Sequence, residues 1–224
     1  MGANRLTTVL FDIDGTLVDS NDSHAHAWVE AFAAEGIRVE FASVRRCIGM
    51  GADKLMPAAA GIDRESPEGK RVAEQRAHIF TERYLPLLRP MPGGAELVQR
   101  VSDEGLAVVA ASSAEREELG RLLEIAGVSH LFDDAASSSD AKESKPDPDI
   151  IHGALKKAGA GPDEAVLIGD TPYDVQAGQR AGVRTIAVRC GGWEDVDLAG
   201  AIAIYNGPAD IVARYASSPL GDRR

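Results

Sequence analysis

Two aspartates stand two residues apart, directly after a short apolar run near the start of the chain. Residues 7–11 (TTVLF) are β-branched and aromatic, which predicts a buried strand, and Asp12 and Asp14 follow it. The carboxyl end of such a strand faces the crevice where α/β proteins bind ligands, and Gly15 lets the backbone turn away. Taken alone, the pair is equally typical of a reactive site and of a solvated acidic turn.

Polar side chains of complementary chemistry follow later apolar runs. Ser112 and Ser113 end one such run, Lys145 precedes a proline in the segment SKPDP, and Asp170 and Asp174 follow another run. Carboxylates at strand ends suit Mg²⁺, a hard cation that prefers oxygen ligands. A hydroxyl and an ammonium suit the non-bridging oxygens of a phosphoryl group. The set therefore predicts a site for phosphoryl transfer.

The elements that must position these residues are predicted by near-continuous apolar runs separated by helical stretches. Such runs are typical of parallel strands covered on both faces, and their alternation with helices predicts an α/β fold with a doubly wound parallel sheet. After the first strand we expect strands over 106–111, 165–168, 183–188 and 201–205, with helices over 94–104, 115–126, 148–158, 173–181 and 208–215.

The alternation stops between about residue 19 and residue 88. This stretch shows helical patterns over 23–35, 52–60 and 67–88 and no convincing strand, and it is far longer than a usual connection between strand and helix. An inserted, all-helical unit is the economical explanation. We therefore predict a core formed by residues 1–17 and 90–224, and a helical domain formed by residues 18–89.

Composition limits the kind of partner. The 224 residues are 44% hydrophobic and carry a formal net charge of −11, which argues against a nucleic-acid surface. The two cysteines suit a reducing compartment, and no apolar run approaches the roughly 18 residues of a membrane span. We expect a cytoplasmic protein, monomeric or weakly dimeric, that acts on a small phosphorylated metabolite and binds neither membrane nor nucleic acid.

The order of the motifs resembles the haloacid dehalogenase-like hydrolase superfamily, and within it the members with a helical cap. DxDGT stands at residues 12–16, Ser112 ends a strand, Lys145 lies in SKPDPD, and GDxxxD ends at Asp174. The resemblance covers nearly the whole chain and implies a Rossmann-like core, a small helical cap and Mg²⁺ as the cofactor. It implies a phosphatase similar to phosphoglycolate phosphatase or to phosphatases of small sugar phosphates.

The resemblance also implies roles for individual residues. Asp12 would attack phosphorus and form an aspartyl-phosphate, and Asp14 would protonate the leaving alkoxide and then take a proton from water. The carboxylates of Asp12 and Asp170 and the backbone carbonyl of Asp14 would hold Mg²⁺.

The remaining motif residues would support this centre. Ser112, Ser113 and Lys145 would hold the phosphoryl oxygens. Asp174 would orient Lys145 or a metal-bound water.

Other functions on the same fold remain open. A β-phosphoglucomutase-like enzyme shares His24 and Trp28, but it uses a cap arginine where this chain has Ala52, and the nearby Lys54 lacks the planar fork of a guanidinium. Asp14 argues against a dehalogenase, because a halide leaves without protonation. An inactive binding module is the third alternative, although every reactive motif residue is present.

Residues of the helical segment carry further hypotheses. One of His24 and His26 packs within the first helix while the other faces solvent, or His24 contacts the substrate or Asp14. Lys54, with the neighbouring arginines Arg45 and Arg46, forms either a cationic face that recognises an anionic group or an ordinary solvated surface. In the core, Trp193 either borders the cleft or anchors a loop.

Overall fold

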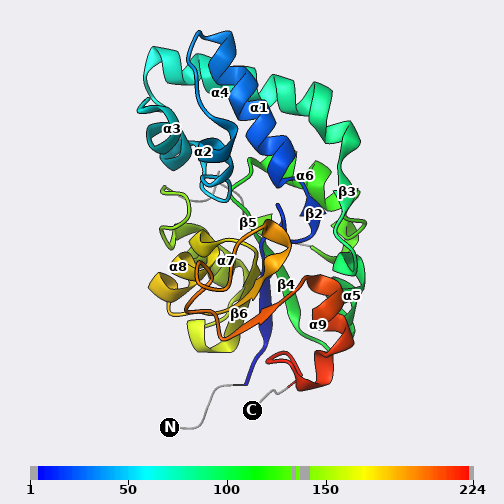
Figure 1. The fold of residues 1–224 in the computed structure, drawn as a ribbon. Coiled ribbons are helices and arrows are strands. Elements are labelled where there is room, and N and C mark those ends of the chain that lie inside the picture. The colour runs from blue at the N-terminus through cyan, green and yellow to red at the C-terminus, as the bar shows by residue number, and fades with distance from the viewer. Residues whose placement is uncertain (1–4, 133–134, 137–141, 222–224) are drawn as a thin grey trace.

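A parallel sheet of six strands forms the centre of the molecule (Figure 1). The computed structural model describes residues 5–132, 135–136 and 142–221. The strand order is β5-β4-β1-β6-β7-β8, and Thr8 lies beside Ala107 on one neighbouring strand and Ala165 on the other. The strands are β1 (Thr8–Phe11), β4 (Ala107–Ala111), β5 (Ala135–Ala136), β6 (Ala165–Gly169), β7 (Arg184–Val188) and β8 (Ala203–Tyr205).

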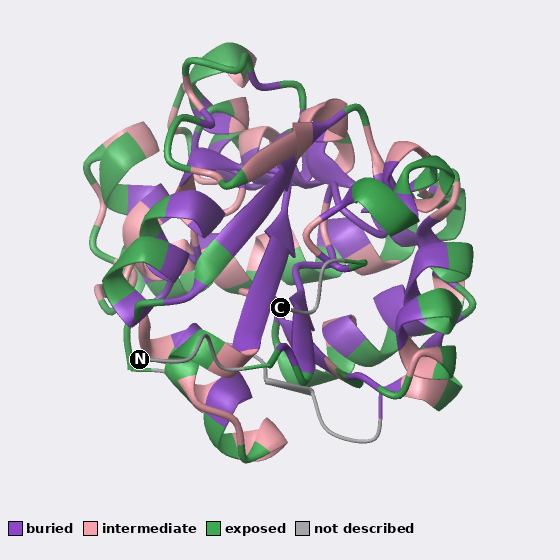
Figure 2. Ribbon diagram, turned by 90° about the horizontal axis from the view of Figure 1, so that it is seen from below, coloured by how far each residue is buried: buried purple, intermediate pink, exposed green. Residues whose placement is uncertain are grey.

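Helices cover both faces of this sheet, which confirms the predicted doubly wound α/β fold. Successive side chains of a strand point to opposite faces, so Val9 and Phe11 pack in one core cluster and Leu10 in another. Figure 2 shows the buried strands between helices whose outer sides are exposed. One cluster includes side chains of α5 (Gly94–Asp103), α6 (Arg116–Ile125) and α9 (Pro208–Ala213), and the other those of α7 (Asp149–Ala158) and α8 (Pro172–Ala181).

A helical insertion leaves and re-enters the core through a two-stranded ribbon. In this ribbon β2 (Val18–Asp19) runs antiparallel to β3 (Arg89–Pro90). Between the two strands, residues 20–88, here called the helical insertion, lie above the carboxyl ends of the sheet with α1 beside α4 (Figure 1). Its helices are α1 (Asn21–Ala34), α2 (Phe41–Arg45), α3 (Ala52–Ala60) and α4 (Pro67–Ile79).

The last predicted helix of the insertion is shorter than expected. Instead of continuing to residue 88, α4 ends at Ile79 and is followed by a π-helical turn, Phe80–Tyr84, and a 3₁₀ turn, Leu85–Leu87. Pro86 has no N–H to donate to the preceding turn, so it does not support a regular α-helix there. The pattern also missed α2, β2, β3 and β5, which are too short to show a period. In the described part of the chain, no helix is both long and apolar enough to cross a membrane.

Candidate active site

The predicted chemical residues meet at the carboxyl ends of the central strands. Asp12 follows β1, Asp170 follows β6, and Lys145 reaches them from the segment before α7. The hydroxyl of Thr16 donates toward both Asp12 Oδ2 (3.3 Å) and Asp170 Oδ1 (3.2 Å), which ties the loops after β1 and β6 together. Sequence reasoning included Thr16 in the motif but gave it no role.

Three buried carboxylates surround one buried ammonium. Asp12, Asp170 and Asp174 each offer an oxygen within 4.8 Å of the others. Lys145 Nζ lies 2.6 Å from Asp12 Oδ1 and 2.7 Å from Asp174 Oδ1, and Lys145 has no exposed surface. Burial would lower the pKa of Lys145, but the two carboxylates outweigh it and raise that pKa.

The charges of this cluster fit a bound cation. Burial raises the pKa of Asp12 well above its ordinary value, against the opposing charge of Lys145, and neighbouring carboxylates add to the rise. Burial and the charge of Asp174 likewise raise the pKa of Asp170 to about 7. One ammonium does not balance three carboxylates, whereas a divalent cation would, and oxygen donors are what Mg²⁺ prefers.

Within the cluster, Asp174 is the least available to a metal. Its Oδ1 pairs with Lys145, and its Oδ2 accepts hydrogen bonds from the N–H (3.0 Å) and hydroxyl (2.6 Å) of Thr171 at the start of α8. Asp170 is held differently, because Asn21 Nδ2 donates to its Oδ2 over 2.7 Å and brings the start of α1 to the site. Asp174 therefore fits a role in positioning Lys145, and Asp12 and Asp170 fit roles as ligands.

Gly15 permits the close approach of these loops. Its φ is +78°, in the left-handed region that disfavours side chains. A Cβ at this position would lie 2.2 Å from both Asp170 Oδ2 and Asn21 Nδ2. The loop after β1 therefore requires glycine for its backbone conformation and for the space beside Asp170.

Asp14 belongs to a second group of contacts that reaches into the helical insertion. Ser20 Oγ donates to Asp14 Oδ1 over 2.6 Å, and His24 Nε2 contacts the same oxygen over 2.6 Å. On the other side of the ring, Arg76 Nη2 contacts His24 Nδ1. Because a guanidinium only donates, Nδ1 accepts and the proton on Nε2 points at Asp14.

These contacts change the acidity of Asp14. Burial alone would raise the pKa of Asp14, but the interaction with His24, the hydrogen bond from Ser20 and the charge of Arg76 outweigh it and lower that pKa. Both contacts are made to the same oxygen, Oδ1. The hypothesis that His24 contacts Asp14 agrees with this geometry.

Arg76 is a site residue that sequence reasoning missed. It lies in α4, more than fifty residues from His24, and no motif or local pattern marks it. Its guanidinium carbon lies 4.8 Å above the ring centre of Phe80, and the His24 ring stacks on the same Phe80 at 4.1 Å. Arg76 also pairs with Glu118 of α6, so it joins the helical insertion to the core.

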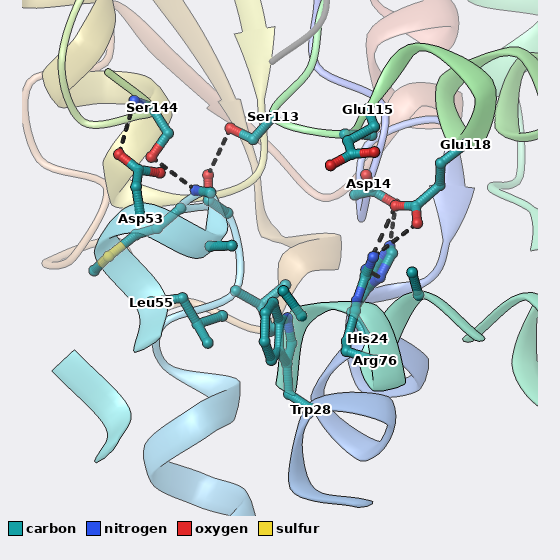
Figure 3. Close-up of a pocket in the computed structure, with 18 of the residues that line it drawn as sticks. Asp14, His24, Trp28, Asp53, Leu55, Arg76, Ser113, Glu115, Glu118 and Ser144 are labelled. Carbon is teal, nitrogen blue, oxygen red and sulfur yellow. Dashed lines mark hydrogen bonds and ion pairs between the residues drawn. The ribbon is translucent and has the colours of Figure 1, made fainter. Parts of the chain in front are cut away.

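A pocket of about 520 Å³ opens between the core and the helical insertion, and Figure 3 shows it. Its lining includes Asp12, Asp14, His24 and Trp28. The two serines predicted to bind phosphate differ in their position relative to the pocket. Ser113 lines the pocket, whereas Ser112 is fully buried and its Oγ accepts from the N–H of Ala114 over 3.1 Å.

Polar contacts hold the helical insertion against the core beside this pocket. Ser113 Oγ donates to the carbonyl of Gly49 over 3.3 Å, and the Gly51 N–H donates to Ser144 Oγ over 3.0 Å. Lys54, a predicted substrate contact, is absent from the described pocket lining. It pairs instead with Glu143 and, over 3.1 Å, with Asp147 of the core.

The other proposed cations and aromatic residues also have structural partners. Arg45 pairs with Asp22 over 2.6 Å, and Arg46 lies 4.6 Å above the ring centre of Trp193. Trp193 itself is packed in a small core cluster, which favours the interpretation as a loop anchor. His26 is exposed and lies 4.5 Å from Phe41, measured between ring centres.

Comparison with known proteins agrees with this fold. The family model for haloacid dehalogenase-like hydrolases matches residues 9–188. The chain is 28% identical to a phosphoglycolate phosphatase from Rhodospirillum rubrum, over 91% of this chain and 88% of that protein. A crystal structure of a hydrolase from Pseudomonas syringae superposes with a TM-score of 0.87 at 30% identity, over 94% of this chain and 98% of that one.

The chain spans only a small part of one longer relative. The chain is 35% identical to Protein SUPPRESSOR OF QUENCHING 1, chloroplastic, from Arabidopsis thaliana, over 83% of this chain but only 18% of that protein. The fold and site define an α/β hydrolase with an acidic, lysine-containing centre. The chain belongs to the haloacid dehalogenase-like hydrolases and is an enzyme of that family.

Proposed function

We propose that this protein is a Mg²⁺-dependent phosphatase that hydrolyses small phosphomonoesters through an aspartyl-phosphate. The observation that carries the proposal is the pairing of Asp12 with a fully buried lysine, at 2.6 Å, beside a second aspartate held by Ser20 and His24. This arrangement supplies a nucleophile, a phosphoryl-binding cation and a separate acid and base.

The first step transfers the phosphoryl group to the protein. A carboxylate oxygen of Asp12 forms a bond to phosphorus while the bond from phosphorus to the alcohol oxygen breaks. Asp14 gives its proton to that oxygen from its protonated form, which the lowered pKa of Asp14 makes the minor form but a stronger acid. Lys145, the hydroxyl of Ser112 and Ser113 would bind the phosphoryl oxygens as their charge is redistributed.

The second step releases phosphate. Water attacks phosphorus, Asp14 takes its proton, and the bond from phosphorus to Asp12 breaks. Asp12 and Asp170, with the backbone carbonyl of Asp14, would hold Mg²⁺, whose positive charge offsets repulsion between the carboxylates and an anionic substrate.

The helical insertion acts as the cap over this chemistry. Its contacts from Gly49 and Gly51 to Ser113 and Ser144 cover the pocket next to Asp12. Closure of this kind excludes bulk water while the phosphoryl group moves and completes the site with residues such as His24. The two free cysteines, Cys47 and Cys190, suit the cytoplasm, where small phosphorylated metabolites are made.

A phosphomutase has less support. Such an enzyme needs an available cation in the cap for a second phosphate. Residue 52 is alanine, Lys54 is held by Glu143 and Asp147, and Arg76 is paired with Glu118. A phosphatase needs no such group, because water accepts the phosphoryl group in the second step.

Phosphate release from a panel of phosphorylated metabolites and from p-nitrophenyl phosphate, with Mg²⁺, tests the proposal. We expect release from several small monoesters and a loss of at least about a thousandfold in Asp12→Asn, because no nucleophile remains. The exposed Asp163→Asn is the matched control and should keep the activity of the unmodified protein. Interconversion of glucose phosphates without net phosphate release would overturn the proposal.

A further inference from the structure

The pocket beside the reacting aspartates contains a guanidinium that is already neutralised. Arg76 Nη1 lies 2.7 Å from Glu118 Oε2, and Arg76 Nη2 lies 3.4 Å from Glu118 Oε1, so the two groups meet at two points. The side chains of Arg76 and Glu118 are only 15% and 16% exposed. Solvent therefore screens this pair much less than a surface pair.

Arg76 is the cation that a second anionic group of a substrate would need. It lies next to His24, which contacts Asp14, and both line the pocket with Trp28 (Figure 3). Guanidinium groups bind carboxylates and phosphates through paired donors, and Glu118 already occupies two of these donors. A substrate carboxylate here would have to displace Glu118 or lie against it.

The other arginines of the lining are neutralised in the same way. Arg121 pairs with Glu117 over 3.1 Å and Arg64 with Glu65 over 3.2 Å, and all four residues line the pocket. These pairs are more exposed than the pair of Arg76 with Glu118, so they contribute less to recognition.

In the part of the lining that the structure describes, two further carboxylates, of Asp53 and Glu115, stand against one further cation, Lys142. Figure 3 shows the Glu115 carboxylate turned into the pocket. Carboxylates repel anions but accept hydrogen bonds from hydroxyl groups. The region that receives the leaving group thus favours hydroxyl groups over anionic groups.

We infer that the substrate is a monophosphate whose leaving group is a neutral, hydroxyl-bearing molecule such as a sugar or polyol, and that Glu118 excludes a second anionic group by neutralising Arg76. The inference rests on the proposed phosphatase activity. It separates the two substrate types that the family resemblance allows, because phosphoglycolate carries a carboxylate and a sugar phosphate does not.

Two substrates that differ only at this group provide the test. Phosphoglycolate and ethylene glycol monophosphate have leaving groups of the same size, one ending in a carboxylate and the other in a hydroxymethyl group. With saturating Mg²⁺, we expect kcat/KM of the unmodified protein to be at least about tenfold higher for ethylene glycol monophosphate, because Asp53 and Glu115 repel a second anion while Glu118 neutralises Arg76.

The variant Glu118→Gln should reverse this preference. It keeps the shape of the side chain but frees the charge of Arg76, so the ratio of kcat/KM for phosphoglycolate to that for ethylene glycol monophosphate should rise about tenfold or more. Glu124→Gln removes a carboxylate from an exposed position of the same helix outside the pocket lining, and its ratio should match the unmodified protein. The double variant Arg76→Gln/Glu118→Gln removes both charges and should return the ratio toward the original value.

The possible outcomes test the proposed phosphatase activity and the inferred substrate preference separately. If the unmodified protein hydrolyses no phosphomonoester, the proposed function fails. If it hydrolyses both substrates but prefers phosphoglycolate, the phosphatase stands and the inference is wrong. A ratio that is unchanged in folded Glu118→Gln, or still raised in the double variant, also overturns the role of Glu118. Since the ratio is measured within one protein sample, a partial loss of folded protein does not affect it.

Discussion

At the scale of single residues, His24 determines the environment of the proposed acid and base. It contacts the same oxygen of Asp14 as Ser20 does, and Arg76 fixes which ring nitrogen carries the proton. Because these contacts orient Asp14 without touching phosphorus, His24 is a positioning residue. The effect of His24 on the rate should therefore be larger for a leaving group that must be protonated.

Replacing His24 tests this role. We expect His24→Asn to slow first-turnover alcohol release from an alkyl phosphate about tenfold or more, because a poorly oriented Asp14 protonates the alkoxide less well. The first-turnover release of p-nitrophenolate should fall much less, since that group leaves without a proton. His26→Asn alters an exposed histidine of the same helix and is the matched control. Equal losses for both substrates would indicate a general structural defect instead.

At the scale of elements, the loop after β1 connects backbone conformation to the proposed metal site. Gly15 has a φ of +78° and leaves no room for a Cβ beside Asp170. Gly36, after α1, has nearly the same φ, +76°, but among the described residues other than its chain neighbours none has an atom within 4 Å of its missing Cβ. An alanine at Gly36 therefore meets only an unfavourable backbone conformation, whereas an alanine at Gly15 also meets close contacts with neighbouring side chains.

We expect alanine at either glycine to lower the free energy of unfolding, by about 1 kcal/mol from the left-handed backbone alone. Only Gly15→Ala should also displace Asp170, so the Mg²⁺ concentration for half-maximal activity should rise about tenfold or more in that variant. Chemical denaturation and Mg²⁺ titration measure the two effects. A normal Mg²⁺ requirement in Gly15→Ala would show that the loop tolerates the side chain.

The same elements show how much the sequence could predict. The five longer strands of the sheet and most helices were predictable because their apolar patterns are long enough to recognise. Asp12, Lys145 and Asp170 were predictable because each follows or precedes such an element within a few residues. The pairing of Arg76 with Glu118 was not, because it depends on how two distant helices are placed, which no local pattern encodes. The partners of Lys54 were not predictable for the same reason. In the sequence it lies near a glycine turn, but in the fold it pairs with Glu143 and Asp147 of the core.

At the scale of the whole molecule, the carboxylate cluster links cation binding to stability. Among the described residues, Asp12, Asp170 and Asp174 lie fully or almost fully buried beside one ammonium, so the folded protein without a divalent cation keeps uncompensated negative charge. The unfolded chain has no such cluster. A cation that binds only the folded protein must therefore raise the free energy of unfolding.

Thermal unfolding with and without Mg²⁺ tests this linkage without using activity. At a Mg²⁺ concentration a hundredfold above the Kd, binding adds about 2.7 kcal/mol, which corresponds to a rise in Tm of roughly 5–10 °C for a chain of this length. In Asp170→Asn one ligand and part of the repulsion are both removed. Its Tm in the presence of a chelator should therefore fall little, while the rise on adding Mg²⁺ should be largely lost. An equal rise in the Tm of Asp170→Asn and of the unmodified protein would place the stabilising cation away from the carboxyl ends of β1 and β6. The acidic cluster would then not be the site that binds the metal.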